Sequence, residues 1–226
     1  REDGAQVDLL LQRAHQNGVN ALKINKQELR ELEPEAQSAS DEAIYCPETS
    51  VIDPKSVLAR KIEELKALGV EIHLDTPFQR VETQKRILHA GGKIFCYGHV
   101  VNAAGLYADK VAHAFDVAHE LTLLPFKGMY WKLSSAASMK VNHLIYPVPD
   151  LRVPFLGVHT TTTTDGTVYL GPTAAPAFGR ENYNGLQGVN LQDTASIVYR
   201  LFEQFAYNKQ GFRNLVFQEM PKYLKS

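Results

Sequence analysis

The chain has 226 residues, 44% of them hydrophobic and 22% charged, and its formal net charge is -1. This composition is typical of a globular chain of one or two domains with enough apolar residues to form a core. A charge so close to neutral supplies no basic surface for nucleic acid, which we therefore exclude as a partner. Cys46 and Cys96 form no C-x-x-C pair, so we expect two buried thiols in a reducing compartment rather than a disulfide scaffold.

No stretch of the sequence approaches the roughly 18 consecutive apolar residues of a membrane-spanning helix. The sequence begins at Arg1 and shows neither a signal peptide nor an initiator methionine there. We therefore expect the chain to be a piece of a longer protein.

The first part of the chain is predicted to be mainly helical. Two helices, over residues 7–17 and 27–33, would form a small leading cap. Asp53 followed by Pro54 predicts the start of a third helix, because aspartate caps a helix and proline suits its first position. The apolar face of this third helix consists of Val57, Leu58, Ile62, Leu65 and Leu68, and the helix ends at Gly69.

Short strands are predicted after the third helix. Residues 70–74 alternate polar and apolar side chains, and three further strands form a meander that includes a Gly91-Gly92 turn. A buried strand from His99 then leads into a helix over residues 107–115. This order favours a parallel sheet that carries an antiparallel excursion. The meander strands are predicted at residues 78–83, 86–90 and 93–97.

The turn between that buried strand and its helix is built from small residues. Ala103, Ala104 and Gly105 leave almost no side-chain bulk, and the helix that follows directs its positive dipole end and free amide groups into the space. This arrangement indicates a seat for an anionic cofactor. A tight strand-to-helix connection, as in any α/β protein, explains the same residues equally well.

Beyond residue 120 the pattern changes to strands punctuated by prolines. Such a run predicts a mostly antiparallel sheet that can present one face to a ligand. A last helix with one apolar face is predicted over residues 193–206. The strands are predicted at residues 121–124, 128–133, 144–146, 155–161 and 167–170.

Several common catalytic motifs are missing from the sequence. It holds no G-x-S-x-G elbow, no G-x-x-x-x-G-K-[ST] phosphate loop and no H-E-x-x-H helix. Cys96 and His99 are spaced like two zinc ligands, but a zinc site needs two more, so we predict no metal site.

Two segments carry a specific similarity: Leu-Ile-Tyr-Pro-Val-Pro-Asp at residues 144–150 and Pro-Phe-Leu-Gly-Val-His at residues 154–159. With the other matching segments, they resemble the L-2-hydroxyglutarate dehydrogenase and oxidase family, which lies within the D-amino-acid-oxidase-like flavoproteins. The other matching segments are residues 27–34, 47–53, 99–109, 125–130, 165–172 and 179–181.

The resemblance implies a mixed α/β (α+β) fold, in which part of a Rossmann-like FAD-binding domain with a β-meander accompanies a mostly antiparallel substrate domain. It implies a leading part of the substrate or cap domain over residues 1–50, an inner part of the FAD-binding domain over 51–118, and the substrate domain with C-terminal helices over 119–226. The family's opening strand with its G-x-G-x-x-G turn, its His-Asn-Ser-Gly segment and its closing strand are not found in this sequence. We therefore expect an internal fragment that does not by itself hold FAD tightly or turn over.

The activity implied by the resemblance is FAD-dependent oxidation of a 2-hydroxy acid, with L-2-hydroxyglutarate oxidised to 2-oxoglutarate. The resemblance assigns the backbone of Val81 to the adenine, and Ala103, Ala104 and Gly105 to the adenosine side of FAD. Taken alone, Val81 would be interpreted as a core residue.

This chemistry needs a base for the hydroxyl proton, and cationic or hydroxyl groups for two substrate carboxylates. His159 is the candidate base in the matching segments; a structural histidine, with the main base outside this chain, is the alternative. The candidate substrate-binding residues are Lys127, Tyr130, Arg152 and Arg180. Their alternatives are a solvated lysine, a tyrosine that caps the core, and two surface arginines.

Other interpretations stay open. Another D-amino-acid-oxidase-like flavoenzyme would take an amino acid or glycerol 3-phosphate, whereas a non-catalytic binding domain would need a self-contained core without exposed apolar sheet edges. We expect a small hydroxy acid as substrate, a quinone or oxygen as electron acceptor, and a C-terminal helix that packs on the body, with peripheral membrane contact as the alternative. The expected location is cytoplasmic or membrane-associated, and mitochondrial if the organism is eukaryotic.

Overall fold

The structure, a computed structural model, describes residues 2–149 and 157–217. The chain divides into two compact units. Unit 1 holds the described residues of 1–59 and 128–174, and unit 2 holds those of 60–127 and 175–217. Arg152, predicted to bind substrate, lies outside the described residues.

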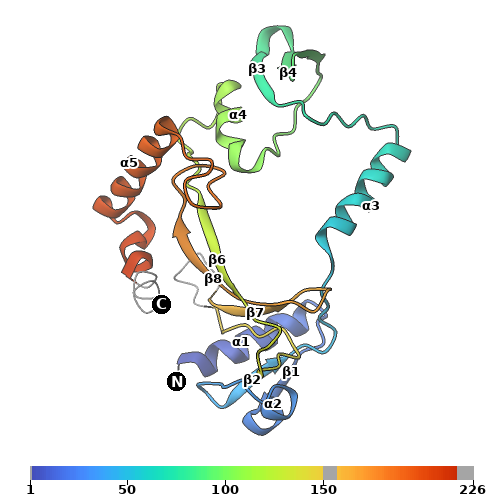
Figure 1. The fold of residues 1–226 in the computed structure, drawn as a ribbon, viewed down its shortest axis with the longest axis vertical. Helices are drawn as coiled ribbons and strands as arrows, with labels where there is room; N and C mark the ends of the chain where they lie inside the picture. The colour runs from blue at the N-terminus through green and yellow to red at the C-terminus, as the bar shows by residue number, and fades with distance from the viewer. Residues whose placement is uncertain (1, 150–156, 218–226) are drawn as a thin grey trace. The chain divides into compact units, whose positions relative to one another are not determined.

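Unit 1 begins with two helices and a small sheet (Figure 1), as the sequence predicts for the two helices. The two strands pair antiparallel, with Leu22 opposite Tyr45. Asn25 starts the second helix through a capping box: its side chain accepts from the backbone amide of Glu28, and the Glu28 carboxylate accepts from the backbone amide of Asn25. The elements are α1 (Glu2–Gln16), β1 (Leu22–Asn25), α2 (Lys26–Leu32) and β2 (Glu42–Tyr45).

A three-stranded sheet has the order β6-β8-β7. β7 and β8 run antiparallel. The amide of Leu133 donates to the carbonyl of Val168 over 2.9 Å, and the amide of Ala177 donates to the carbonyl of Pro125 over 3.0 Å. These bonds show that β6 and β8 also run in opposite directions. The strands are β6 (Phe126–Lys132), β7 (His159–Thr162) and β8 (Val168–Pro176).

The turn between β7 and β8 is closed by its own side chains. The amide of Thr163 donates to the carbonyl of Thr167 over 2.8 Å, and Gly166 has a positive φ of 81°. The Asp165 carboxylate accepts hydrogen bonds from the Thr163 hydroxyl and the Thr167 amide, and these bonds lower its pKa to about 2. The turn is therefore stabilised by residues within it.

Unit 2 contains the predicted meander, an antiparallel sheet of order β3-β4-β5. Its Gly91-Gly92 turn has φ values of 54° and 75°, and a Cβ on Gly91 would lie 2.8 Å from the Thr76 Cα. Phe78 of the meander stacks on Phe115 at the end of α4, with ring centroids 6.3 Å apart. The elements of this unit include β3 (Phe78–Glu82), β4 (Ile87–Ala90), β5 (Lys93–Cys96), α4 (Ala108–Ala114) and α5 (Leu191–Tyr207), with a 3₁₀ turn over Gly105–Tyr107.

Helix α3 (Pro54–Ala67) begins where Asp53-Pro54 predicts. The Asp53 carboxylate accepts from the amides of Lys55 and Ser56 at 3.1 and 3.2 Å. No residue of α3 is buried. The helix is therefore defined by local signals, since the described chain does not cover its apolar face.

Four strands that the sequence predicts are absent from the described residues. Residues 70–74, 99–101, 121–124 and 144–146 form no strand. A β-strand exists only where a neighbouring strand accepts and donates its backbone hydrogen bonds, and no ladder in the described chain includes these segments. The sequence predicts that the strand from His99 is buried, yet Val101 in this segment is 90% exposed.

The cysteine prediction is also wrong in part. The sequence predicts that both thiols are buried, but Cys96 is exposed and Cys46 is half-buried. Cys96 ends β5, an edge strand of the meander, and its side chain lies at the surface of the described chain. No helix within the described ranges is long and apolar enough to cross a membrane.

The predicted fold class is nevertheless confirmed: the protein is a mixed α/β chain with antiparallel sheets. Buried apolar side chains in the described residues are few and mostly small: Val7, Ala21, Ala90, Ala177, Ile197 and Leu215.

Candidate functional site

The turn at residues 102–105 has a fixed shape and a bare surface. Asn102 organises it, because its side-chain amide donates to the Ala108 carbonyl over 2.8 Å and its side-chain oxygen accepts from the Ala104 amide over 3.2 Å. Ala103, Ala104 and Gly105 are exposed, Gly105 has a φ of 53°, and nothing lies within 4 Å of the place where its Cβ would be. A flat cofactor can therefore approach this backbone closely, so the residues fit the adenosine side of FAD.

Val81 lies in β3, half-buried and opposite Leu88 of β4. The same strand contributes Phe78, whose contact with Phe115 joins the meander to α4. Val81 and the turn before α4 thus belong to one unit, as a shared cofactor site requires.

Arg180 forms a bidentate ion pair with Asp109. The two guanidinium nitrogens donate to the two carboxylate oxygens over 2.6 and 2.8 Å, and the guanidinium also donates to the Leu106 carbonyl. Both side chains are nearly buried, with 10% and 7% of their surface exposed. Burial raises the pKa of Asp109, but the bonds from Arg180 and from two backbone amides outweigh burial and bring this pKa down to about 2. The Arg180 guanidinium therefore braces the segment next to the Gly105 turn.

Two further contacts reinforce that brace. The Tyr107 hydroxyl donates to the Glu181 carboxylate over 2.8 Å, which raises the pKa of Tyr107. Lys110 pairs with Asp193 at the start of α5, also over 2.8 Å. The loop after β8 is thus bonded to the turn and helix that follow residue 102.

Lys127 is half-buried in β6 and donates to the side-chain oxygen of Asn182 over 3.4 Å. Asn182 is itself buried, with 3% of its surface exposed, and donates to the carbonyls of Gly185 and Gln187. Within the described ranges, no carboxylate pairs with Lys127. An anion-binding role for Lys127 stays a prediction.

His159 is buried at the start of β7 between two tyrosines. Its Nδ1 lies 3.0 Å from the Gly157 carbonyl oxygen, which can only accept a hydrogen bond. Nδ1 must therefore carry the proton, so Nε2 of the neutral ring holds a lone pair. The Tyr146 ring stacks on the imidazole at 4.6 Å between centroids, and the Tyr130 ring stands edge-on to it at 6.5 Å.

Two glycines set the position of Tyr130. A Cβ on Gly171 would lie 2.7 Å from the Tyr130 ring, and a Cβ on Gly128 would lie 3.0 Å from Pro172. In the structure, the close approach at Gly128 is to β8.

The structure thus brings some predicted site residues together, while another is engaged in an ion pair. Tyr130 and His159 are in contact, and Ala103 to Gly105 form one surface, whereas Arg180 is occupied by Asp109. Sequence reasoning did not single out the pair of Glu33 and His143. Glu33 is buried and His143 is half-buried, and Glu33 Oε1 lies 2.9 Å from His143 Nδ1. The sequence signals that could have found them are that Glu33 lies in the matching segment 27–34 and that His143 directly precedes the matching segment 144–150.

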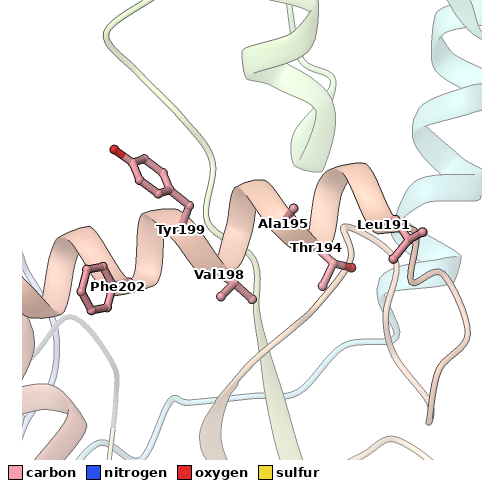
Figure 2. Close-up of a pocket in the computed structure, with 6 residues that line it drawn as sticks. All are labelled: Leu191, Thr194, Ala195, Val198, Tyr199 and Phe202. Carbon is pink, nitrogen blue, oxygen red and sulfur yellow. The ribbon is translucent and has the colours of Figure 1, made fainter.

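An open hollow in the described part of the chain lies along α5 (Figure 2). None of the predicted site residues lines it. Its lining is almost entirely apolar and consists of Leu191, Thr194, Ala195, Val198, Tyr199 and Phe202. Among the described residues, no group of three or more histidine, cysteine, aspartate and glutamate side chains could hold a metal ion.

Comparison with known proteins defines the class. Residues 1–221 match the sequence profile of the FAD dependent oxidoreductase family, so the chain belongs to this family. A solved structure shares the fold: L-alpha-glycerophosphate oxidase from Mycoplasma pneumoniae, with FAD bound, has a TM-score of 0.59 and 23% identity over 83% of this chain and 51% of its own.

Among curated proteins, the chain is similar to L-2-hydroxyglutarate dehydrogenases. The chain is 37% identical to the L-2-hydroxyglutarate dehydrogenase of Indibacter alkaliphilus over 193 residues, which cover 84% of this chain and 48% of that protein. It is 31% identical to the mitochondrial L-2-hydroxyglutarate dehydrogenase of Mus musculus, over 96% of this chain and 48% of that protein. The chain thus spans about half the length of the curated relatives that it matches. These findings confirm the predicted family and its cofactor, FAD.

Proposed function

We propose that the complete protein containing this chain is an FAD-dependent dehydrogenase that oxidises L-2-hydroxyglutarate to 2-oxoglutarate. The similarity to L-2-hydroxyglutarate dehydrogenases over most of the chain supports the substrate. The geometry of His159 is the observation that carries the chemistry. Its Nδ1 is fixed as a donor by the Gly157 carbonyl, so its Nε2 is available to accept a proton.

In the proposed reaction, the substrate hydroxyl gives its proton to His159 Nε2 while the hydrogen on C2 leaves with its electron pair. The C2–O bond becomes a carbonyl, so one proton and one hydride leave the substrate. FAD, when bound, supplies the acceptor for the hydride. His159 suits its role because the Gly157 carbonyl fixes Nδ1 as the donor and the stacked Tyr146 ring holds the imidazole in one orientation.

The residues proposed for FAD are Val81, Ala103, Ala104 and Gly105. The small, exposed surface of the turn supports this assignment. The division of the chain into a cap part (1–50), an inner FAD-binding part (51–118) and a substrate part (119–226) stays a proposal with it.

For the substrate, we propose Lys127 and Tyr130 as the carboxylate-binding groups of this chain, with Arg152 as a further cation. Lys127 has a charge that no described carboxylate neutralises, and the Tyr130 ring meets the proposed base. Arg180 was predicted in the same role, but Asp109 occupies its guanidinium. We therefore favour an indirect part for Arg180, through the loop that it braces.

Anaerobic flavin reduction tests the proposal. The complete purified protein is mixed with L-2-hydroxyglutarate, and the flavin absorbance band is expected to bleach. D-2-hydroxyglutarate tests the stereochemistry, and L-lactate, which lacks the second carboxylate, tests the dicarboxylate clamp. Lys127→Met is expected to raise KM for L-2-hydroxyglutarate more than for L-lactate.

Two results would contradict the proposal. Bleaching by glycerol 3-phosphate or an amino acid, with none by L-2-hydroxyglutarate, would assign the protein to another activity of the family. Failure of the complete protein to bind FAD would favour a binding domain without catalysis.

The electron acceptor and the location are also proposals. A quinone or oxygen would reoxidise the flavin, and reoxidation rates with each acceptor in turn would distinguish them. The name of the mouse relative supports a mitochondrial location if this organism is eukaryotic. For a bacterial source, we propose a cytoplasmic or membrane-associated location. The apolar face of α5 is exposed in the described chain, and we propose that it packs on the body of the complete protein, with peripheral membrane contact as the alternative.

A further inference from the structure

The buried carboxylate of Glu33 lies outside the proposed proton-transfer site and holds the segment that leads to that site. Glu33 follows α2 directly, and only 3% of its surface is exposed. Its Oε1 accepts from the backbone amide of Asn142 over 2.6 Å, from the backbone amide of His143, and from the His143 ring Nδ1 over 2.9 Å. The Asn142 side chain also donates to the Leu32 carbonyl over 3.2 Å. All of these residues belong to unit 1.

The segment held by Glu33 continues along the beginning of β7. The amide of Thr160 donates to the Ile145 carbonyl over 2.9 Å, and the amide of Ile145 donates to the Thr160 hydroxyl over 2.8 Å. The same hydroxyl donates to the His143 carbonyl over 3.3 Å. Beside this pair, Tyr146, which follows Ile145, stacks on His159, which precedes Thr160, with an angle of 26° between the ring planes.

These contacts connect Glu33, through residues 142–146, to the ring of His159. A buried carboxylate is costly unless donors satisfy it, and all three donors of Oε1 come from two consecutive residues of the segment. The segment cannot shift without leaving that charge unpaired. The Tyr146 ring, and with it one face of the imidazole, is therefore fixed from a residue that is more than 100 positions away in the sequence.

We propose that Glu33 is a positioning residue for proton transfer at His159, acting through the segment 142–146 and the Tyr146 ring. This inference rests on the proposed function, in which His159 accepts the substrate proton. Glu33 itself contacts no substrate in this role. Its effect is to keep the imidazole in the orientation that presents Nε2.

The first experiment observes the His159 imidazole directly and needs no measurement of activity. In NMR spectra of the complete protein, the ring protons of His159 are expected to be shifted by the ring current of Tyr146. Glu33→Ala is expected to move these signals toward those of Tyr146→Leu, whereas Glu33→Gln, which keeps an acceptor oxygen, is expected to leave them near their original position. Glu35→Ala is the matched control, because Glu35 is an exposed carboxylate two residues further along.

The second experiment is a double-mutant cycle on flavin reduction by L-2-hydroxyglutarate. Glu33→Ala is expected to lower kcat by about 10- to 100-fold, a range typical of residues that orient a reacting group, with KM little changed and with a displaced pH profile. Because Glu33 acts through Tyr146, adding Glu33→Ala to Tyr146→Leu is expected to cost little more. Full rescue of kcat by Glu33→Gln supports the same route, and it keeps the test decisive if Glu33→Ala does not fold.

The outcomes separate the inference from the function on which it rests. Unchanged His159 signals in Glu33→Ala, or losses of kcat that multiply fully in the double variant, would overturn the positioning role. A His159→Gln variant that reduces its flavin at the original rate would instead overturn the proposed base, and the NMR result would still decide whether Glu33 orients the ring.

Discussion

The Gly105 turn and the His159 cluster are built in opposite ways. The turn is local: Asn102 bonds to residues two and six positions away, and the result is an exposed surface of small residues. The cluster is assembled from distant parts of the chain, since Glu33 secures residue 142 and Tyr146 covers His159. The comparison teaches that the turn proposed for the cofactor is encoded in a few neighbouring residues, whereas the orientation of the proposed base, His159, requires tertiary contacts.

The largest expected effect tests the cluster. His159→Gln is expected to lower the rate of flavin reduction by L-2-hydroxyglutarate by about 10²- to 10⁴-fold, because glutamine cannot accept the proton at the position of Nε2. Single-turnover absorbance measurements on the complete protein give this rate. His119→Gln serves as control, since the His119 side chain is 60% exposed and pairs with Asp116 on the surface. Equal rates in the two variants would remove His159 from the reaction.

The second prediction tests whether the turn is as independent of tertiary structure as its local bonds indicate. Asp109→Asn leaves the nearly buried guanidinium of Arg180 without its counter-charge, and we expect a loss of about 3 kcal/mol in the free energy of unfolding. Urea denaturation measures this loss. Asp116→Asn, at a side chain that is 96% exposed, is expected to change the stability by less than about 1 kcal/mol. A small effect at Asp109 would mean that the turn does not need the brace.

The pH dependence of stability sharpens the same point. Folding lowers the pKa of Asp109 from 3.8 to about 2, so its ion pair stabilises the protein fully above about pH 4 and ceases to do so as the pH falls through 2. The difference in unfolding free energy between the original protein and Asp109→Asn is therefore expected to shrink by about 2 kcal/mol between pH 5 and pH 2. Urea titrations across this range measure it. A gap that stays constant would show that the pair does not depend on the Asp109 charge.

The smallest expected effect concerns the turn itself. Gly105→Ala places a Cβ at a residue with a φ of 53°, which is expected to cost about 1 kcal/mol in stability and to weaken FAD binding. Gly98→Ala is the control, because Gly98 has open space and no positive φ. FAD fluorescence titration and urea denaturation report the two effects. Unchanged FAD affinity in Gly105→Ala would argue against this turn as part of the cofactor site.

The sequence alone determined the features that arise from neighbouring residues. The capped start of α3 at Asp53 and the Gly91-Gly92 turn of the meander both occur where their residues predict them, because capping and positive φ depend on residue types a few positions apart. The fold class and the family followed from such signals taken in order. The same local information could not decide whether residues 70–74 and 99–101 pair as strands, because pairing depends on a neighbouring strand.

Only the tertiary structure decided which charged and aromatic side chains meet. Nothing near Arg180 in the sequence indicates that Asp109 neutralises it, and nothing near His159 indicates a connection to Glu33. Both results depend on segments far apart in the chain that are brought together by packing, and a buried carboxylate then takes whichever donors that packing supplies. The sequence therefore identified the turn proposed for the cofactor and named His159, while the structure revealed what holds each in place.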